Sequence, residues 1–450
     1  MTLADRLARG DSASAKGVNQ AQSLRAIVHE TQRDDQAELK VGVHNELIEM
    51  LGQQLYGDQI DVATLERNVF EAITKVLSTF DHPLSGLDRA SLMQEVTDEI
   101  LGLGPLQPLL RDPNISEIMV NRFDRIYIEQ NGKITPTDLQ FASEEHLRRT
   151  IDRIVNTVGR RVDESSPMVD ARLPDGSRVN AVVPPIALDG SSLTIRKFNE
   201  DAFTSRDLVT METVSQAAMD VLAACVRGRL NIVISGGTGS GKTTTLNVLS
   251  SFIPEDERII TVEDAAELSL NQPHVVRMET RPPNVEDRGL VTVRDLVRNA
   301  LRMRPDRIVV GEVRDGAALD MLQAMNTGHD GSLTTVHANS ARDALSRIET
   351  MVLMAGMDLP IRAIREQIVH AINVVVQQSR LRDGSRRITK ISEITGLEGD
   401  TIVMQDLYTF EYNDSKRGSL GSMVPTGIMP EFLDRLSTQD VHLSGDYFRK

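Results

Sequence analysis

The segment GGTGSGKT, from Gly236 to Thr243, has the residue types and spacing of a phosphate-binding loop. Its glycines let the backbone curl until successive N–H groups point at one anion, at the start of a helix. Lys242 can reach the β- and γ-phosphates of a nucleoside triphosphate, and the Thr243 hydroxyl can bind Mg²⁺. An apolar run precedes the loop and a helix-compatible run follows it. The sequence therefore predicts an ATP site formed by Gly236, Gly237, Thr238, Gly239, Ser240, Gly241, Lys242, Thr243 and Thr244.

Two further segments place carboxylates where strands are expected to end. In RIVVGE, Glu312 lies just past the apolar strand, and we interpret it as the base that orients and deprotonates water. Gly311 occupies the position where an Asp usually holds Mg²⁺. In TVEDAAEL, Glu263 and Asp264 end another strand, and Glu263 could hold Mg²⁺ through a water molecule. Two adjacent acids are more often solvated turn residues, so spacing alone leaves this assignment open.

Two histidines flank an apolar strand in TGHDGSLTTVHAN. His329 and His337 are eight residues apart without a Cys or a third His nearby, which makes a poor metal site. His337, at the end of the strand, could sense the γ-phosphate. A buried, hydrogen-bonded histidine fits the same pattern equally well.

Three arginines are candidates for contact with a phosphate. Arg172 and Arg178 bracket the turn-like LPDGS, and Arg196 lies in the strand-like LTIRKF. An arginine presented by a neighbouring subunit accelerates phosphoryl transfer by orders of magnitude. Exposed arginines on loops are common, so the sequence by itself leaves their role undecided.

The elements that must position these residues alternate between helix and strand from about Val209. A helix is expected at 212–228, and strands at 231–235, 258–263, 274–279, 307–312 and 332–338. This succession is typical of a mostly parallel sheet with helices on both faces, so the fold class is α/β. The preceding part has strand periodicity at 115–120, 125–130, 177–183 and 192–198 and a helix at 143–159.

The domain organisation follows from these changes of period. We expect a disordered or weakly helical lead-in at 1–40, a helical module at 41–103, an α+β domain at 104–198, a linker at 199–208, the α/β domain at 209–410 and a C-terminal tail at 411–450.

The composition excludes several classes of protein. A net charge of −15 disfavours a general nucleic-acid binder, so no nucleic-acid partner is expected. The single cysteine, Cys225, excludes an internal disulfide framework and a tetracysteine zinc site. No apolar run approaches the roughly 18 residues of a membrane span, and the start of the chain lacks a secretory signal. A cytoplasmic location is expected.

The sequence resembles the secretion-superfamily ATPases. Their Walker A, Asp box, Walker B and His box correspond in order and spacing to GGTGSGKT, RIITVEDAAEL, LRMRPDRIVVGEVRD and AMNTGHDGSLTTVHANS. The segments LGLGPLQPLLRDPNISEIMVN, RIYIEQNGKI and DALSRIETMVLMAGMDLP look like the CpaF/TadA branch, the tight-adherence (Flp, type IVc) pilus ATPases. The resemblance covers about residues 40–400.

This resemblance implies a RecA-like ATPase domain, preceded by a small PAS-like α+β domain and an N-terminal helical module. It implies a homo-hexamer that binds ATP and Mg²⁺ between the two domains and acts on an inner-membrane platform protein, so the chain would be peripheral to that membrane. It assigns Lys242, Glu263, Glu312, His329 and His337 to the catalytic site and Arg172, Arg178 and Arg196 to nucleotide contact. The absent aspartate at Gly311 is shared by the superfamily.

Alternative functions remain open. The traffic ATPases of type IV secretion systems share LPDGSRV and LTIRKF with this chain but normally lack so long a helical extension. The assembly ATPases of type II secretion and type IVa pili usually carry the zinc site that a single cysteine excludes. A nucleotide-dependent switch with little turnover is a further alternative, and a nucleic-acid translocase is disfavoured by the acidic charge.

Overall fold

In the computed structural model, the described residues are 102–450 except 131, 199–202, 284–287 and 413–420, with Arg67, Glu71, Thr74, Lys75, Gln94, Thr97 and Asp98. These seven isolated residues are helical, whereas the lead-in expected at 1–40 lies outside the described residues. The chain divides into two compact units. One comprises Met1–Ala171 with Val179–Lys197, and the other Arg172–Arg178 with Phe198–Lys450.

The first unit contains a six-stranded sheet in the order β3-β2-β1-β6-β5-β4. Its described elements are η2 (Gly104–Leu106), α4 (Gln107–Arg111), β1 (Ile115–Arg122), β2 (Arg125–Gln130), β3 (Lys133–Pro136), α5 (Glu144–Thr157), β4 (Met168–Arg172), β5 (Arg178–Val182) and β6 (Ser192–Arg196). Helix α5 begins where the Ser143 side chain accepts a hydrogen bond from the N–H of His146. The predicted strands and helix of this region are confirmed, and β3 and β4 are additional.

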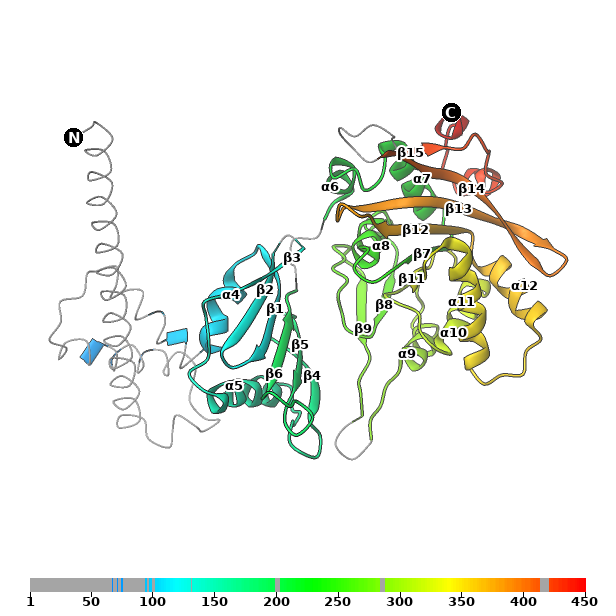
Figure 1. Cartoon of the computed structure of the whole chain (residues 1–450). Coiled ribbons are helices and arrows are strands. Elements are labelled where there is room, and N and C mark those ends of the chain that lie inside the picture. The colour runs from blue at the N-terminus through cyan, green and yellow to red at the C-terminus, as the bar shows by residue number, and fades with distance from the viewer. Residues whose placement is uncertain are drawn as a thin grey trace, which may run out of the picture. The chain divides into compact units, whose positions relative to one another are not determined.

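The second unit contains a nine-stranded sheet in the order β15-β14-β13-β12-β7-β11-β10-β8-β9 (Figure 1). Its strands are β7 (Ile232–Gly236), β8 (Ile259–Glu263), β9 (Val275–Glu279), β10 (Arg307–Val310), β11 (Leu333–His337), β12 (Val374–Arg380), β13 (Arg386–Glu398), β14 (Thr401–Tyr412) and β15 (Gly421–Pro425). Strands β7 to β12 pair in parallel, and β13, β14 and β15 extend the sheet in antiparallel fashion. The predicted parallel strands are therefore confirmed.

Helices cover both faces of this sheet because its central strands are apolar on both faces. On β7, Val233 belongs to the core under α9 to α12, whereas Ile232 and Ile234 belong to the core under α6, α7 and α8. These helices are α6 (Ser205–Thr210), α7 (Gln216–Arg227), α8 (Lys242–Ser250), α9 (Val293–Ala300), α10 (Ala317–Asn326), α11 (Ala341–Met354) and α12 (Ile361–Ala371). No helix in the described part of the chain is long and apolar enough to cross a membrane.

The C-terminal residues take part in the same sheet and core. Strand β14 crosses residue 411, where the sequence analysis placed the start of a tail, and β15 pairs with it. Leu436 of α13 (Leu433–Thr438) and Phe448 of η3 (Gly445–Phe448) are buried in the core that contains α7. Register shifts interrupt the pairing of β13 with β14, and one of them lies at Gly396. These irregularities obscure the two-residue alternation that identifies strands from sequence.

Candidate active site

The loop that follows β7 has the conformation that its glycines predict. Gly239 and Gly241 have φ angles of +68° and +96°, a region that residues with a Cβ atom rarely adopt. A Cβ at Gly236 would lie 2.6 Å from the Ser240 Oγ, so this position also requires glycine. A Cβ at Gly237 or Gly239 would meet no atom within 4 Å. These last two glycines therefore border open space, as a loop that admits a ligand must.

Three donors inside the loop converge on one oxygen. The Gly237 carbonyl accepts hydrogen bonds from Lys242 Nζ at 3.0 Å, Ser240 Oγ at 2.9 Å and the Ser240 N–H at 3.4 Å. Burial lowers the pKa of the Lys242 ammonium, an effect that nearby Glu312 opposes and Arg314 reinforces. A half-buried ammonium whose acceptor is a neutral carbonyl is well suited to an anion, which would offer the same donors a charged acceptor.

The carboxyl ends of β8 and β10 bring the two predicted acids to the same end of the sheet as the loop. Glu263, the last residue of β8, is 3% exposed. Its Oε2 accepts hydrogen bonds from the N–H groups of Glu267 at 2.8 Å and Leu268 at 3.0 Å. Its Oε1 is buried and has no hydrogen-bond partner within the described residues. Burial raises the pKa of Glu263, although the two N–H groups lower it again.

The glycine that replaces the usual aspartate has a steric reason. Strands β8 and β10 pair in parallel with Val262 opposite Val310, so Glu263 lies beside Gly311. A Cβ at Gly311 would lie 3.0 Å from Glu263 Cγ and 3.4 Å from its Oε2. The Glu263 side chain thus fills the space that a side chain at 311 would need. The carboxylate comes from the neighbouring strand instead of from β10.

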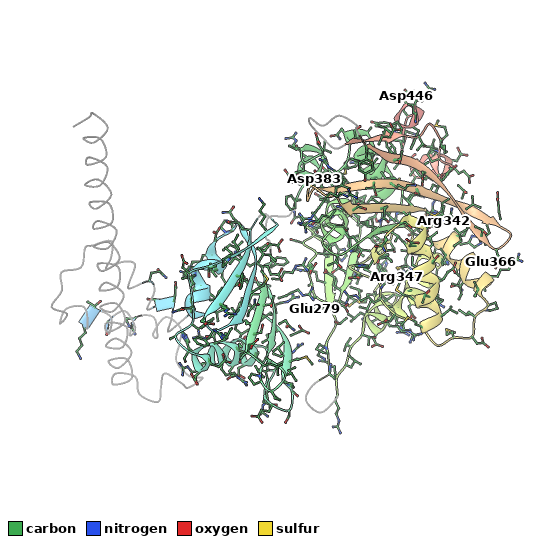
Figure 2. All side chains as sticks on the ribbon, in the orientation of Figure 1. Glu279, Arg342, Arg347, Glu366, Asp383 and Asp446 are labelled. Carbon is green, nitrogen blue, oxygen red and sulfur yellow. The ribbon has the colours of Figure 1, made fainter. Side chains whose placement is uncertain are left out.

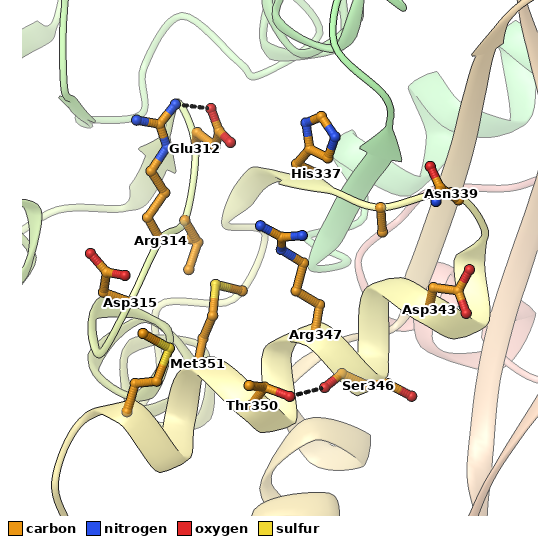
Figure 3. A pocket seen from close by; sticks show the side chains of 13 residues that line it. Glu312, Arg314, Asp315, His337, Asn339, Asp343, Ser346, Arg347, Thr350 and Met351 are labelled. Carbon is orange, nitrogen blue, oxygen red and sulfur yellow. Dashed lines mark hydrogen bonds and ion pairs between the residues drawn. The ribbon is translucent and has the colours of Figure 1, made fainter.

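Glu312 lines a pocket of about 570 Å³ beyond the end of β10. Its Oε2 is 2.8 Å from Arg314 Nη2, and Arg314 Nη1 is 3.1 Å from Asp264 Oδ2. The hydrogen bond with Glu312 raises the pKa of Arg314. Figure 3 shows Glu312 and His337 at the same side of the pocket, with Arg347 of α11 reaching toward them. A glutamate carboxylate at the edge of such a pocket can accept a proton from a water molecule.

The two histidines lie at opposite ends of β11. His337 ends the strand opposite Gly236, and its Nδ1 is 3.5 Å from Thr238 Oγ1, with the donor set by the tautomer. His329 precedes the strand, and its buried Nδ1 has no hydrogen-bond partner in the described part of the chain. The structure therefore places His337, and not His329, beside the phosphate-binding loop.

The three candidate arginines have other partners in this chain. Arg172 and Arg178 belong to the segment that groups with the second unit. Arg172 Nη1 is 3.0 Å from Glu279 Oε2, and Arg178 Nη1 is 2.9 Å from Glu267 Oε1. Figure 2 labels Glu279 among the side chains of that unit. Arg196 lies on β6 of the first unit, opposite Glu117 of β1. Their contact with a nucleotide remains a prediction.

Two residues beside the loop were not predicted from the sequence. Gln378 of β12 accepts a hydrogen bond from Thr245 Oγ1 at 2.8 Å, and Arg386 of β13 donates from Nε to the Gly239 carbonyl at 3.0 Å. No motif contains them. The arginine-rich turn RLRDGSRR after an apolar run is the only sequence signal that marks this hairpin.

A phosphate-binding loop with two carboxylates and a histidine at one end of a parallel sheet defines a P-loop nucleotide-hydrolysing protein. The family model of the type II/IV secretion system proteins matches residues 99–403, more than half of the chain. The chain therefore belongs to this family, and the predicted ATPase class is confirmed.

Several relatives are similar over most of their own length. A putative conjugal transfer protein of Mycobacterium tuberculosis is 38% identical over 307 residues, covering 67% of this chain and 87% of the relative. The type IV secretion system protein VirB11 of Bartonella henselae is 32% identical, covering 64% and 91%. The crystal structure of the VirB11 ATPase from the Brucella suis type IV secretion system, in complex with sulphate, is 31% identical, covers 64% and 94%, and has a TM-score of 0.36.

Proposed function

We propose that this chain is a hexameric, Mg²⁺-dependent ATPase that powers assembly of a tight-adherence type IV pilus at the bacterial inner membrane. The observation that supports the proposal best is the convergence of the phosphate-binding loop, Glu263, Glu312 and His337 at one end of the sheet. In this proposal the nucleotide-contacting residues are those of the loop, Gly236 to Thr244.

The loop and its lysine bind the phosphates. Backbone N–H groups of the loop face the β-phosphate, and the Lys242 ammonium exchanges the Gly237 carbonyl for phosphate oxygens. This exchange replaces a neutral acceptor by an anionic one, which strengthens the hydrogen bond. Lys242 then neutralises charge that builds up on the γ-phosphoryl group during transfer.

The residues present fit a magnesium ion. Mg²⁺ prefers oxygen ligands and retains several waters. The unpartnered Oε1 of Glu263 can hold such a water, and the Thr243 hydroxyl at the start of α8 can bind the ion directly. When bound, Mg²⁺ supplies positive charge that stabilises the phosphates during transfer. A second carboxylate at position 311 is not required, because Glu263 occupies its space.

Glu312 acts on the attacking water. Its carboxylate, held beside Arg314, orients the water in line with the γ-phosphoryl group and accepts the water's proton as the new P–O bond forms, while the bond from the γ-phosphorus to the bridging oxygen breaks and ADP leaves. His337, beside Thr238, is placed to respond to the γ-phosphate. Arg172, Arg178 and Arg196 are proposed to reach a nucleotide in the assembled hexamer, and His329 is proposed to act only in that assembly.

A second candidate function is that of a traffic ATPase in a type IV secretion or conjugation system. The names of the relatives favour it, since they include conjugal transfer proteins and VirB11. The segments that look like the CpaF branch favour the pilus. In either case the chain would be cytoplasmic and would reach the membrane through platform proteins.

A complementation experiment in the bacterium that encodes this chain separates the two. The gene is deleted and replaced by wild type, by Glu312→Gln or by Glu255→Gln, which changes an exposed glutamate in the turn before β8 that is not one of the proposed site residues. Surface pili are counted by electron microscopy, and DNA transfer is measured by mating. We expect the deletion and Glu312→Gln to lose pili and the control to keep them.

Co-expression of Glu312→Gln with wild type should also reduce piliation, because inactive subunits enter mixed hexamers. Normal pili in the deletion strain, with DNA transfer lost, would refute the pilus assignment and support the traffic ATPase. Full complementation by Glu312→Gln would refute a motor that depends on hydrolysis.

A further inference from the structure

The hairpin formed by β12 and β13 runs alongside the phosphate-binding loop. Strand β12 pairs in parallel with β7 and places Gln378 opposite Gly236, where β7 ends. It continues to Arg380, and after a short turn β13 returns from Arg386. The hairpin therefore extends beyond the end of β7 and flanks the loop on the side away from β11.

The turn of this hairpin is well defined. The Asp383 carboxylate accepts hydrogen bonds from the Ser385 N–H at 2.9 Å and the Ser385 hydroxyl at 2.7 Å. Leu381 and Ser385 are joined by a backbone hydrogen bond of 2.8 Å. Figure 2 labels Asp383 in this turn. An ordered turn fixes the point from which β13 starts, and hence the position of Arg386.

We propose that Arg386 is a positioning residue for the phosphate-binding loop, an inference that rests on the proposed nucleotide site. Its Nε donates to the Gly239 carbonyl at 3.0 Å. Because a trans peptide is planar, a carbonyl held toward the hairpin keeps the following N–H, that of Ser240, pointing away from it. Arg386 thereby fixes the orientation of a peptide group whose N–H belongs to the anion-binding loop.

The geometry around Arg386 supports this role. A Cβ at Gly241 would lie 3.2 Å from Arg386 Cδ, so the arginine packs closely over the loop's last glycine. The next residue, Arg387, is 7% exposed and donates from Nη1 to the Met211 carbonyl at 3.0 Å. Successive side chains of a strand point to opposite faces. The buried anchor of Arg387 therefore fixes the direction in which Arg386 points, although Arg386 itself is exposed.

The position of the contact determines which nucleotides should be affected. Gly239 lies within the loop, whose N–H groups cradle the α- and β-phosphates. Loss of the contact should weaken the binding of ADP and ATP to the same extent. Turnover at saturating ATP should change little, because Arg386 makes no hydrogen bond or ion pair with Glu312 or Glu263 among the described residues.

The test compares Arg386→Ala and Arg386→Lys with wild type, using Arg382→Ala as the matched control. Arg382 lies in the same hairpin, is exposed and makes no hydrogen bond or ion pair with another described residue. Dissociation constants are measured with fluorescent methylanthraniloyl derivatives of ADP and ATP, and KM and kcat with Mg-ATP. Thermal unfolding of each variant verifies its fold.

We expect Arg386→Ala to raise both dissociation constants and KM about tenfold, the effect of one hydrogen bond from a charged donor. Its kcat should stay within about twofold of wild type, Arg386→Lys should recover part of the affinity, and Arg382→Ala should match wild type. Equal affinities in Arg386→Ala and Arg382→Ala would overturn the inference. So would a loss of kcat without a loss of affinity. If wild type binds no nucleotide, the proposed function itself fails.

Discussion

The two ends of the strand pair β8 and β10 differ in whether their buried charged groups have partners of opposite charge. At the amino-terminal end, Arg307 is fully buried and Glu257, just before β8, is 7% exposed. Arg307 Nη2 donates to Glu257 Oε1 at 3.1 Å, and its Nη1 donates to the carbonyls of Val226 at 2.9 Å and Gly331 at 3.2 Å. Arg229 adds a second ion pair to Glu257, at 3.3 Å. Arg307, Glu257 and Arg229 therefore each have a partner of opposite charge.

At the carboxyl-terminal end of these strands, beside the phosphate-binding loop, polar groups lack such partners. One oxygen of the Glu263 carboxylate is buried and has no hydrogen-bond partner among the described residues. The half-buried Lys242 ammonium donates to a neutral acceptor, the Gly237 carbonyl. Glu312 lines an open pocket. A buried polar atom without a partner costs free energy, and such sites are therefore expected where a ligand supplies the missing contact.

The comparison indicates that the amino-terminal ends contribute stability and the carboxyl-terminal ends contribute chemistry. In open parallel sheets, ligands bind outside the carboxyl ends of the strands. In this protein, residues for stability and residues for chemistry lie at opposite ends of the same two strands. Substitutions at the two ends should therefore have separable effects on unfolding and on turnover.

The largest effect on stability is expected from Arg307→Leu. It removes the fully buried partner of the Glu257 carboxylate and should lower the free energy of unfolding by about 3–5 kcal/mol, as for other broken buried pairs. Urea denaturation measures this loss. Phosphate release per folded molecule should stay within about twofold of wild type, because Arg307 lies at the far end of β10 from Glu312.

The double variant Arg307→Leu with Glu257→Leu is the control for this interpretation. Replacing both charges by apolar side chains avoids leaving a buried carboxylate with Arg229 as its one remaining ion-pair partner, so it should recover much of the lost stability. A double variant as unstable as the single one would contradict the assignment of the cost to an uncompensated charge. A stable Arg307→Leu without activity would contradict the division between the two ends.

Glu263→Gln is expected to reduce turnover, in contrast to Arg307→Leu, which is expected to reduce stability. The amide oxygen can still accept from the N–H groups of Glu267 and Leu268, but it cannot replace the charged oxygen that holds a metal-bound water. Turnover should fall about 10–100-fold, as for other residues that support a metal site. The affinity for Mg²⁺, measured from the magnesium dependence of turnover, should weaken in parallel.

The difference in stability between wild type and Glu263→Gln should depend on pH. Burial raises the pKa of Glu263 in the folded protein above its ordinary value of 4.5. Below that ordinary value the carboxyl is protonated in both states and costs little. As pH rises toward the folded-state pKa, the unfolded chain loses its proton first, and wild type loses stability.

Glutamine has no proton to lose, so the melting temperature of Glu263→Gln relative to wild type should be higher at pH 8 than at pH 5. Glu255→Gln, an exposed control, should show the same difference from wild type at both pH values. A pH-independent difference for Glu263→Gln would contradict the burial of an ionisable carboxyl.

The elements that position the site were predictable where local patterns are strong. The loop motif requires particular residues at particular spacing, and β7, β8, β10 and β11 are short apolar runs bounded by turns. Glu312 was predicted from its place at the end of an apolar strand, whereas spacing alone left Glu263 open and the family resemblance assigned it to the site. His329 was grouped with His337 because the two residues bracket an apolar run, yet His337 is the last residue of β11 and His329 precedes the first residue of that strand.

Contacts between distant segments could not be predicted in the same way. Arg386 and Gly239 are 147 positions apart, and Arg307 and Glu257 are 50 apart. Exposed arginines are frequent in this sequence, so nothing local distinguishes the one that contacts the loop. The steric reason for Gly311 likewise depends on the side chain of a neighbouring strand. Such features arise from the packing of the sheet and require coordinates.

The most direct test of the central claim is phosphate release from Mg-ATP by wild type and Glu312→Gln, with nucleotide binding measured on the same preparations. A general base contributes about 10²–10⁴-fold to rate. We predict that Glu312→Gln loses turnover within this range and binds ATP as tightly as wild type. Equal rates in the two proteins would contradict the assignment of Glu312 as the base and favour a nucleotide-dependent switch.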